Sequence, residues 1–194
     1  MIQAPFEEIF NRIRNGQMVV MVADDSPESE GDLVMAAEKV TAEHVNFMAH
    51  QGRGIVSVAL TETRFRELGI PLLPSTEGEQ ASQQVGASVE ARVGVSTGIS
   101  AGDRACTIQV VASDKSGPQD LVMPGHVPPL MALAGGVMMR TQRAEGAVDL
   151  VRGAGLRACA ALCAILRDDG EAARMAELEE FARTNDFPIC TIRS

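Results

Sequence analysis

The acidic residues between positions 24 and 32 are the first candidates for chemistry. The stretch DDSPESEGD carries five carboxylates in nine residues, those of Asp24, Asp25, Glu28, Glu30 and Asp32. Carboxylate oxygens bind divalent cations and can also take up or release a proton. A run of charges is equally common on a solvated turn. The stretch alone therefore leaves two interpretations open, a site for a cation or a proton and an exposed loop.

Apolar segments on both sides of this stretch predict that two strands hold it. Residues 17–23, QMVVMVA, are typical of a buried strand, and residues 32–38, DLVMAAE, predict a second one. Functional residues often lie on loops that a rigid scaffold positions. The flanking strands therefore favour a functional loop over a merely solvated turn.

The remaining segments mix helices and strands without a strict βαβ order. Helices are predicted after Pro5, after the cap Thr41, from the cap Ser100, and at residues 62–70, 144–153 and 171–186. Strands are predicted at residues 54–61, 156–166 and 187–192. Residues 117–130, which contain His126, are extended and proline-rich, and residues 71–84 are polar and expected to be flexible. The pattern predicts one α+β domain over residues 1–194, with a mixed sheet packed with helices.

Composition excludes several classes of function. The chain has 194 residues, a net charge of −9, six Phe and neither Trp nor Tyr, so its core must be aliphatic. A protein this acidic, without basic stripes or aromatic platforms, is not expected to bind nucleic acid. No apolar run long enough to span a membrane is present, and Glu7 and Glu8 interrupt any export signal. The four cysteines form no CxxC pair, which predicts reduced, buried thiols in a cytoplasmic protein.

Several motifs in fixed order resemble the 3,4-dihydroxy-2-butanone-4-phosphate synthase family of riboflavin biosynthesis. They include DDSPESEGDLVMAAEKVT, TGISAGDR, PGHVPPL, EGAVDLVRGAG and FARTNDFPICTI, and the match runs nearly end to end. The resemblance implies an α+β homodimer with active sites at the subunit interface. It also implies conversion of ribulose 5-phosphate to a four-carbon ketone phosphate and formate, with Mg²⁺ or Mn²⁺.

The resemblance also implies roles for four polar residues. Glu28 matches the metal-ligating glutamate, Asp32 the substrate-binding aspartate, His126 the essential histidine and Arg140 the anion-binding arginine. We therefore expect His126, Glu28 and Asp32 to be catalytic. Substrate is expected to bind to Arg140, Arg143, Glu28 and Asp32. The alternative for His126 is a structural histidine that hydrogen-bonds backbone.

Four other positions depart from the family pattern. Pro27 replaces an arginine, Arg143 a histidine that ligates metal, Ala144 a phosphate-binding threonine, and Ala164 an essential glutamate. Arginine stays protonated and cannot ligate a cation, and alanine can neither give nor take a proton. No metal is therefore expected, except through Glu28 if one is retained. Arg143 is expected to place a fixed charge beside Glu28 or, alternatively, to lie in solvent.

These observations predict a divergent enzyme that acts on a small anionic, enolisable sugar phosphate or keto compound. A homodimer with an interfacial site is expected, in which Arg140 and Arg143 form an anion-binding pair beside His126. The alternatives are a non-catalytic homologue, as a ligand-binding or dimer-partner protein, and an authentic synthase.

Overall fold

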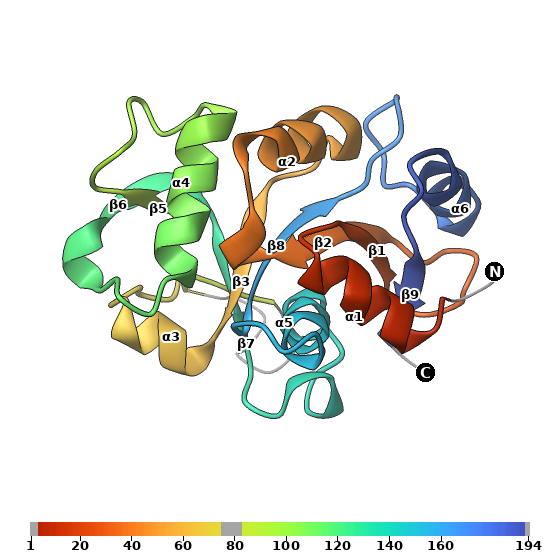
Figure 1. Cartoon of the computed structure of the whole chain (residues 1–194), viewed down its shortest axis with the longest axis horizontal. Helices are drawn as coiled ribbons and strands as arrows, with labels where there is room; N and C mark the ends of the chain where they lie inside the picture. The colour runs from red at the N-terminus through yellow and green to blue at the C-terminus, as the bar shows by residue number, and fades with distance from the viewer. Residues whose placement is uncertain (1–3, 75–82, 193–194) are drawn as a thin grey trace.

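A computed structural model describes residues 4–74 and 83–192 (Figure 1). A seven-stranded mixed sheet forms its centre, in the order β4-β7-β3-β8-β2-β1-β9. Its strands are β1 Val19–Val22, β2 Gly31–Ala36, β3 Ser57–Thr61, β4 Gln84–Val85, β7 Pro129–Ala132, β8 Cys159–Ala164 and β9 Ile189–Thr191. Two strands, β5 Val89–Ala91 and β6 Leu121–Val127, form a separate antiparallel sheet.

Helices cover both faces of the large sheet. They are α1 Phe6–Arg14, α2 Ala42–Phe47, α3 Glu62–Glu67, α4 Ala101–Ala112, α5 Arg143–Gly153 and α6 Met175–Thr184. Shorter helical turns are η1 Ala37–Lys39, η2 Met48–Gly52, η3 Pro118–Asp120 and η4 Gly136–Met138. One apolar cluster joins the sheet to α2, α3, α4 and α6, and a second joins it to α1 and α5. Figure 1 shows α2 and α4 above the strands and α5 below them.

Strand register brings the end of the acidic loop beside the end of β8. Strand β1 pairs antiparallel with β2, with Val22 opposite Gly31, so residues 23–30 form the connecting loop. Strand β2 also pairs antiparallel with β8, where Asp32 lies opposite Ala164. Two positions that the sequence singles out therefore become direct cross-strand neighbours.

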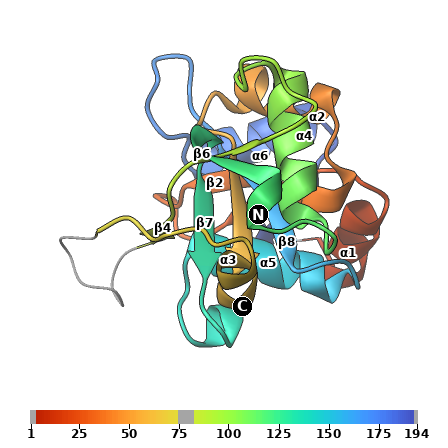
Figure 2. The ribbon, with the colours of Figure 1, turned by 90° about the vertical axis from the view of Figure 1, so that its left-hand side faces the viewer.

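The small sheet lies beside α4, as Figure 2 shows from the side of β6. His126 is on β6 and Glu90 on β5. Strand β6 lies within residues 117–130, which the sequence predicts to be extended, whereas no element was predicted where β5 lies. The pairing of these two segments was not predicted.

Most predicted elements are confirmed, including the strands on both sides of the acidic loop and the capped helices. Thr41 accepts a hydrogen bond from the backbone N–H of His44, and Ser100 accepts one from that of Asp103. Three of the four cysteines are buried, but Cys106 is only half-buried. The predicted flexible segment 71–84 falls largely on residues 75–82, which lie outside the described residues. Every described helix is too short or too polar to cross a membrane.

Candidate active site

A cavity of about 230 Å³ opens where the start of β2, the end of β8 and the start of α5 meet. Its polar lining comes from Glu30, Asp32, Thr141, Gln142 and Arg143. Ala164 and several aliphatic side chains complete the wall. A concave site with a few convergent polar groups is the usual form of a small-molecule pocket.

An ion pair between Asp32 and Arg143 dominates this cavity. Nη2 of Arg143 donates a hydrogen bond to Oδ1 of Asp32. The Asp32 side chain is 11% exposed and that of Arg143 is 35% exposed, so the carboxylate is enclosed while the guanidinium reaches solvent. The sequence predicts that Arg143 pairs with Glu28, and this detail is wrong because Arg143 lies against Asp32 instead.

Burial changes the acidity of Asp32. Its pKa is raised from 3.8 to about 6, chiefly because the enclosed carboxylate loses hydration, and Arg143 only partly reverses this effect. The neighbouring Cys163 is buried behind the same strands, and loss of hydration raises the pKa of its thiol to about 12. Asp32 can therefore exchange a proton near neutral pH, whereas Cys163 is not a nucleophile there.

The residues of the cavity do not fit a pair of divalent cations. Among the described residues that line it, Glu30 and Asp32 are the only carboxylates, and Asp32 already neutralises Arg143. Across residues 4–74 and 83–192, no group of three or more His, Cys, Asp and Glu side chains is arranged to hold a metal ion. Magnesium prefers several oxygen ligands in octahedral geometry, which two carboxylates beside a guanidinium do not supply.

Arg140 lies close in sequence but makes a different contact. Its Nε and Nη2 donate to Oε1 of Glu145 at 3.0 and 2.6 Å, and Nη2 also donates to the carbonyl of Met131 at 3.0 Å. The side chains of Arg140 and Glu145 are 7% and 0% exposed. The same Oε1 accepts the backbone N–H of Leu133 at 2.8 Å. Arg140 thus braces the turn before α5, and it does not line the cavity with Arg143 as the expected anion-binding pair requires.

Glu28 lies on the exposed part of the acidic loop and does not line the cavity. Its backbone carbonyl accepts a hydrogen bond from Arg174 at 2.7 Å, and Glu30 forms an ion pair with the same arginine at 3.1 Å. Asp24 accepts hydrogen bonds from Ser26 and Ser29. Most of the acidic loop therefore braces itself or faces solvent, and the roles expected for Glu28 stay predictions.

His126 also lies outside this cavity. Its Nδ1 is 2.6 Å from Oε2 of Glu90, and its side chain is 45% exposed. The alternative for His126 was a structural histidine that hydrogen-bonds backbone. The structure instead places its ring against the carboxylate of Glu90. Sequence reasoning missed Glu90, whose only signal is an acidic residue in the strand-like segment SVEA.

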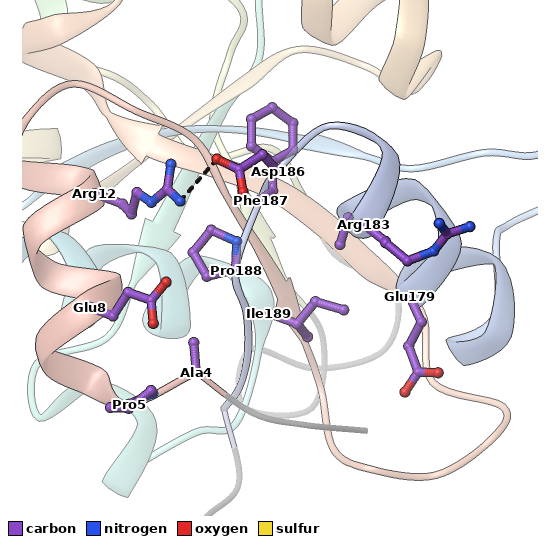
Figure 3. Close-up of a pocket in the computed structure, with 11 residues that line it drawn as sticks. Ala4, Pro5, Glu8, Arg12, Glu179, Arg183, Asp186, Phe187, Pro188 and Ile189 are labelled. Atoms are coloured by element: carbon purple, nitrogen blue, oxygen red, sulfur yellow. Dashed lines mark hydrogen bonds and ion pairs between the residues drawn. The ribbon is translucent and has the colours of Figure 1, made fainter.

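A larger groove of about 680 Å³ lies between α1 and α6, at the outer strand β9 (Figure 3). Arg12 on α1 forms an ion pair with Asp186 at 3.0 Å, and Glu179 and Arg183 of α6 lie on the opposite wall. None of the residues expected to be functional lines this groove. The smaller cavity with Asp32 and Arg143 is therefore the better candidate.

Comparison with known proteins identifies relatives along nearly the whole chain. The family described as 3,4-dihydroxy-2-butanone 4-phosphate synthase matches residues 7–194. A curated 3,4-dihydroxy-2-butanone 4-phosphate synthase of Pseudomonas aeruginosa is 43% identical over 186 residues, which are 96% of this chain and 51% of that protein. The chain spans about half the length of several curated relatives that it matches.

Solved structures of such enzymes confirm the predicted fold class. A 3,4-dihydroxy-2-butanone 4-phosphate synthase of Candida albicans has a TM-score of 0.92 at 35% identity, over 99% of this chain and 95% of that one. Another 3,4-dihydroxy-2-butanone 4-phosphate synthase, in complex with two magnesium ions, has a TM-score of 0.87 at 34% identity. The match covers 97% of this chain and 93% of that one. The predicted mixed sheet packed with helices is therefore correct.

Proposed function

This chain belongs to the 3,4-dihydroxy-2-butanone 4-phosphate synthase family, and we propose that it acts on a small anionic, enolisable sugar phosphate or keto compound. The substrate binds in the cavity that holds Asp32 and Arg143, without the two cations of the magnesium-bound relative. Riboflavin biosynthesis is the context that the family suggests.

The ion pair of Asp32 and Arg143 is the observation that carries this proposal. Asp32 takes a proton from the carbon next to the substrate's carbonyl, and the electron pair moves onto the carbonyl oxygen. Arg143 supports the resulting enolate, because its guanidinium is permanently charged and donates hydrogen bonds in a fixed fork. A pKa of about 6 suits Asp32 to this exchange near neutral pH.

The proposal includes a homodimer with the site at the subunit interface. His126 lies on β6, outside the cavity of its own chain, and a second copy could bring its His126 to Asp32 and Arg143. Sedimentation at micromolar concentration is expected to give a dimer. A stable monomer that is fully active would contradict the shared site. A cytoplasmic location and the absence of nucleic-acid binding stay predictions.

Proton exchange in D₂O tests the proposed chemistry. Ribulose 5-phosphate is incubated with the protein in the presence of a chelator, and NMR follows the proton next to the carbonyl. Deuterium is expected to replace that proton in the wild type but not in Asp32→Asn or Arg143→Ala. Arg183→Ala, which removes an exposed arginine on α6, is the matched control and should exchange normally. Absence of exchange across a panel of sugar phosphates would contradict the proposal.

Authentic synthase activity is a second candidate, favoured by the 43% identity to the Pseudomonas aeruginosa enzyme. It would release formate and a four-carbon ketone phosphate when Mg²⁺ or Mn²⁺ is added. The alternative of a non-catalytic homologue is favoured by Ala164, which puts a methyl group opposite Asp32. Calorimetry that detects sugar-phosphate binding without deuterium exchange would support that alternative.

A further inference from the structure

A second cavity, of about 270 Å³, adjoins the candidate site. It lies between α1 and α5, which pack beside each other (Figure 1). Two side chains line both cavities, that of Met21 on β1 and that of Ile192, which follows β9. The two cavities therefore have an apolar wall in common.

The two cavities also follow one face of α5. Arg143 lines the first cavity, and Gly146 and Leu150 line the second. These positions are three and four residues apart, so they lie on the same side of the helix. Along the helix axis, Gly146 is about 5 Å and Leu150 about 10 Å from Arg143. A molecule whose polar end contacts Arg143 can therefore extend along α5 into the second cavity.

Glycine at position 146 leaves room where the two cavities meet. A Cβ there would lie 2.8 Å from Cδ1 of Ile192 and 2.9 Å from Sδ of Met21. An alanine would therefore push these two side chains from their present positions. Methionine is unbranched and flexible, so Met21 can adapt to a ligand that crosses the common wall.

The lining of the second cavity is mainly apolar. Besides the shared Met21 and Ile192, its aromatic and aliphatic side chains are those of Phe6, Phe10, Val137, Met138 and Leu150. Asp149 is the only charged side chain among the described residues that line it, and its Oδ2 already accepts the N–H of Val137 at 2.9 Å. A phosphate would meet no cation there, whereas an apolar group would be removed from water.

The size of the second cavity suits a ring or a branched alkyl group, because an apolar cavity of about 150 Å³ is already large enough to hold benzene. We infer that the two cavities form one elongated site for an anionic keto compound with an apolar tail, such as a 2-oxo acid. Its keto and carboxylate groups lie at Arg143, and its tail passes Gly146 toward Leu150. The placement of the polar end rests on the proposed function, whereas the binding of an apolar tail does not.

Calorimetry with straight-chain 2-oxo acids, from 2-oxobutanoate to 2-oxooctanoate, tests the tail site. We expect the affinity of the wild type to rise about threefold for each methylene that enters the second cavity, because the methylene leaves water for an apolar lining. An affinity that stays the same across the series would overturn the inference.

Two exposed methionines of one turn provide a matched pair of variants. Met138 is 90% exposed and lines the second cavity, whereas Met139 is 71% exposed and is not among the described residues that line it. Met138→Ser should weaken the binding of 2-oxooctanoate about threefold, and Met139→Ser should leave it unchanged. Equal effects of the two changes would overturn the inference.

Gly146→Ala tests the passage between the cavities. This variant should bind 2-oxooctanoate about tenfold more weakly than the wild type and should bind 2-oxobutanoate with the same affinity. If the gain with chain length persists in Gly146→Ala, the tail is bound elsewhere on the protein and the inference is wrong.

Deuterium exchange at the carbon next to the keto group separates this inference from the proposed function. If 2-oxooctanoate binds with the expected dependence on Gly146 but exchanges no faster than in Asp32→Asn, the proposed function fails and the tail site stands. If the wild type catalyses exchange but binds short and long acids equally well, the tail site fails and the proposed function stands.

Discussion

Arg143, the first residue of α5, donates a hydrogen bond from Nη2 to Oδ1 of Asp32, near the start of β2. The contact joins positions that are 111 residues apart in the chain. It puts a permanent positive charge over a carboxylate whose hydration is largely lost. The pair is therefore both a tertiary link and the centre of the candidate site.

A double-mutant cycle should reveal this link in the stability of the protein. Arg143→Ala leaves Asp32 enclosed without its cation, and we expect a loss of about 1–3 kcal/mol in the free energy of unfolding at pH 8. In the Asp32→Asn background the same change should cost much less. Urea denaturation of the four proteins gives the coupling energy. A coupling below about 0.5 kcal/mol, as for an exposed pair, would contradict a structural role.

The pH dependence of stability should carry a contribution from Asp32. Its pKa is about 6 in the folded chain, above the ordinary 3.8, so between pH 4 and 6 the unfolded chain releases a proton that the folded chain keeps. Stability from this group is therefore present at low pH and is lost as pH rises to 6, by up to about 3 kcal/mol. Subtracting the curve of Asp32→Asn from that of the wild type isolates the effect. A difference that is constant from pH 4 to 7 would refute it.

The strands around the acidic loop were predictable because apolar runs on both sides of a charged stretch are local signals. The caps Thr41 and Ser100 were predictable for the same reason, since each cap and its partner lie three residues apart. The partner of Arg143 was not predictable from such local signals. Asp32 is already within β2, opposite Ala164, whereas Glu28 is still in the loop, and only the register of β2 against β8 separates the two choices.

The contacts of His126 and Arg140 were missed for a related reason. Glu90 meets His126 only because four residues are inserted in β6, and periodicity within either segment does not reveal an insertion in their pairing. Glu145 had a usable signal, because an acidic residue in an otherwise apolar helical face is costly to bury unless it is paired. Arg140, five residues earlier, was the available partner.

Magnesium should have little effect on the wild-type protein. Because Arg143 already forms an ion pair with the Asp32 carboxylate, about 1 mM Mg²⁺ is expected to leave the Tm of the wild-type protein unchanged. Arg143→His replaces the guanidinium with an imidazole that can ligate a metal beside Asp32 and Glu30. The Tm of this variant should rise with Mg²⁺ or Mn²⁺ concentration. Arg143→Leu also removes the charge but adds no ligand, so it should not respond. If calorimetry showed that the wild-type protein binds Mg²⁺ or Mn²⁺ with micromolar affinity, this would contradict the poor fit of the site to a cation.

The Arg140–Glu145 pair should matter more for folding than any surface pair. Both side chains are almost fully buried, and one oxygen of Glu145 accepts from Nε and Nη2 of Arg140 and from the backbone of Leu133. Glu145→Ala leaves a buried guanidinium without that carboxylate, and we expect it to cost about 3–5 kcal/mol in the free energy of unfolding. Glu180→Ala, which breaks an exposed pair with Arg183, should cost less than about 1 kcal/mol.

Urea denaturation compares these variants, and Glu145→Gln keeps the size of the side chain if Glu145→Ala does not fold. The amide retains one acceptor oxygen but loses the charge, so an intermediate loss is expected. The result also decides how Arg140 acts. If Arg140 serves mainly to bind the anionic group of the substrate, Glu145→Gln should raise KM and leave the unfolding midpoint at its wild-type value. The buried geometry requires the reverse, a lower midpoint in Glu145→Gln together with an unchanged KM, so that any loss of activity appears in kcat and follows the folded fraction.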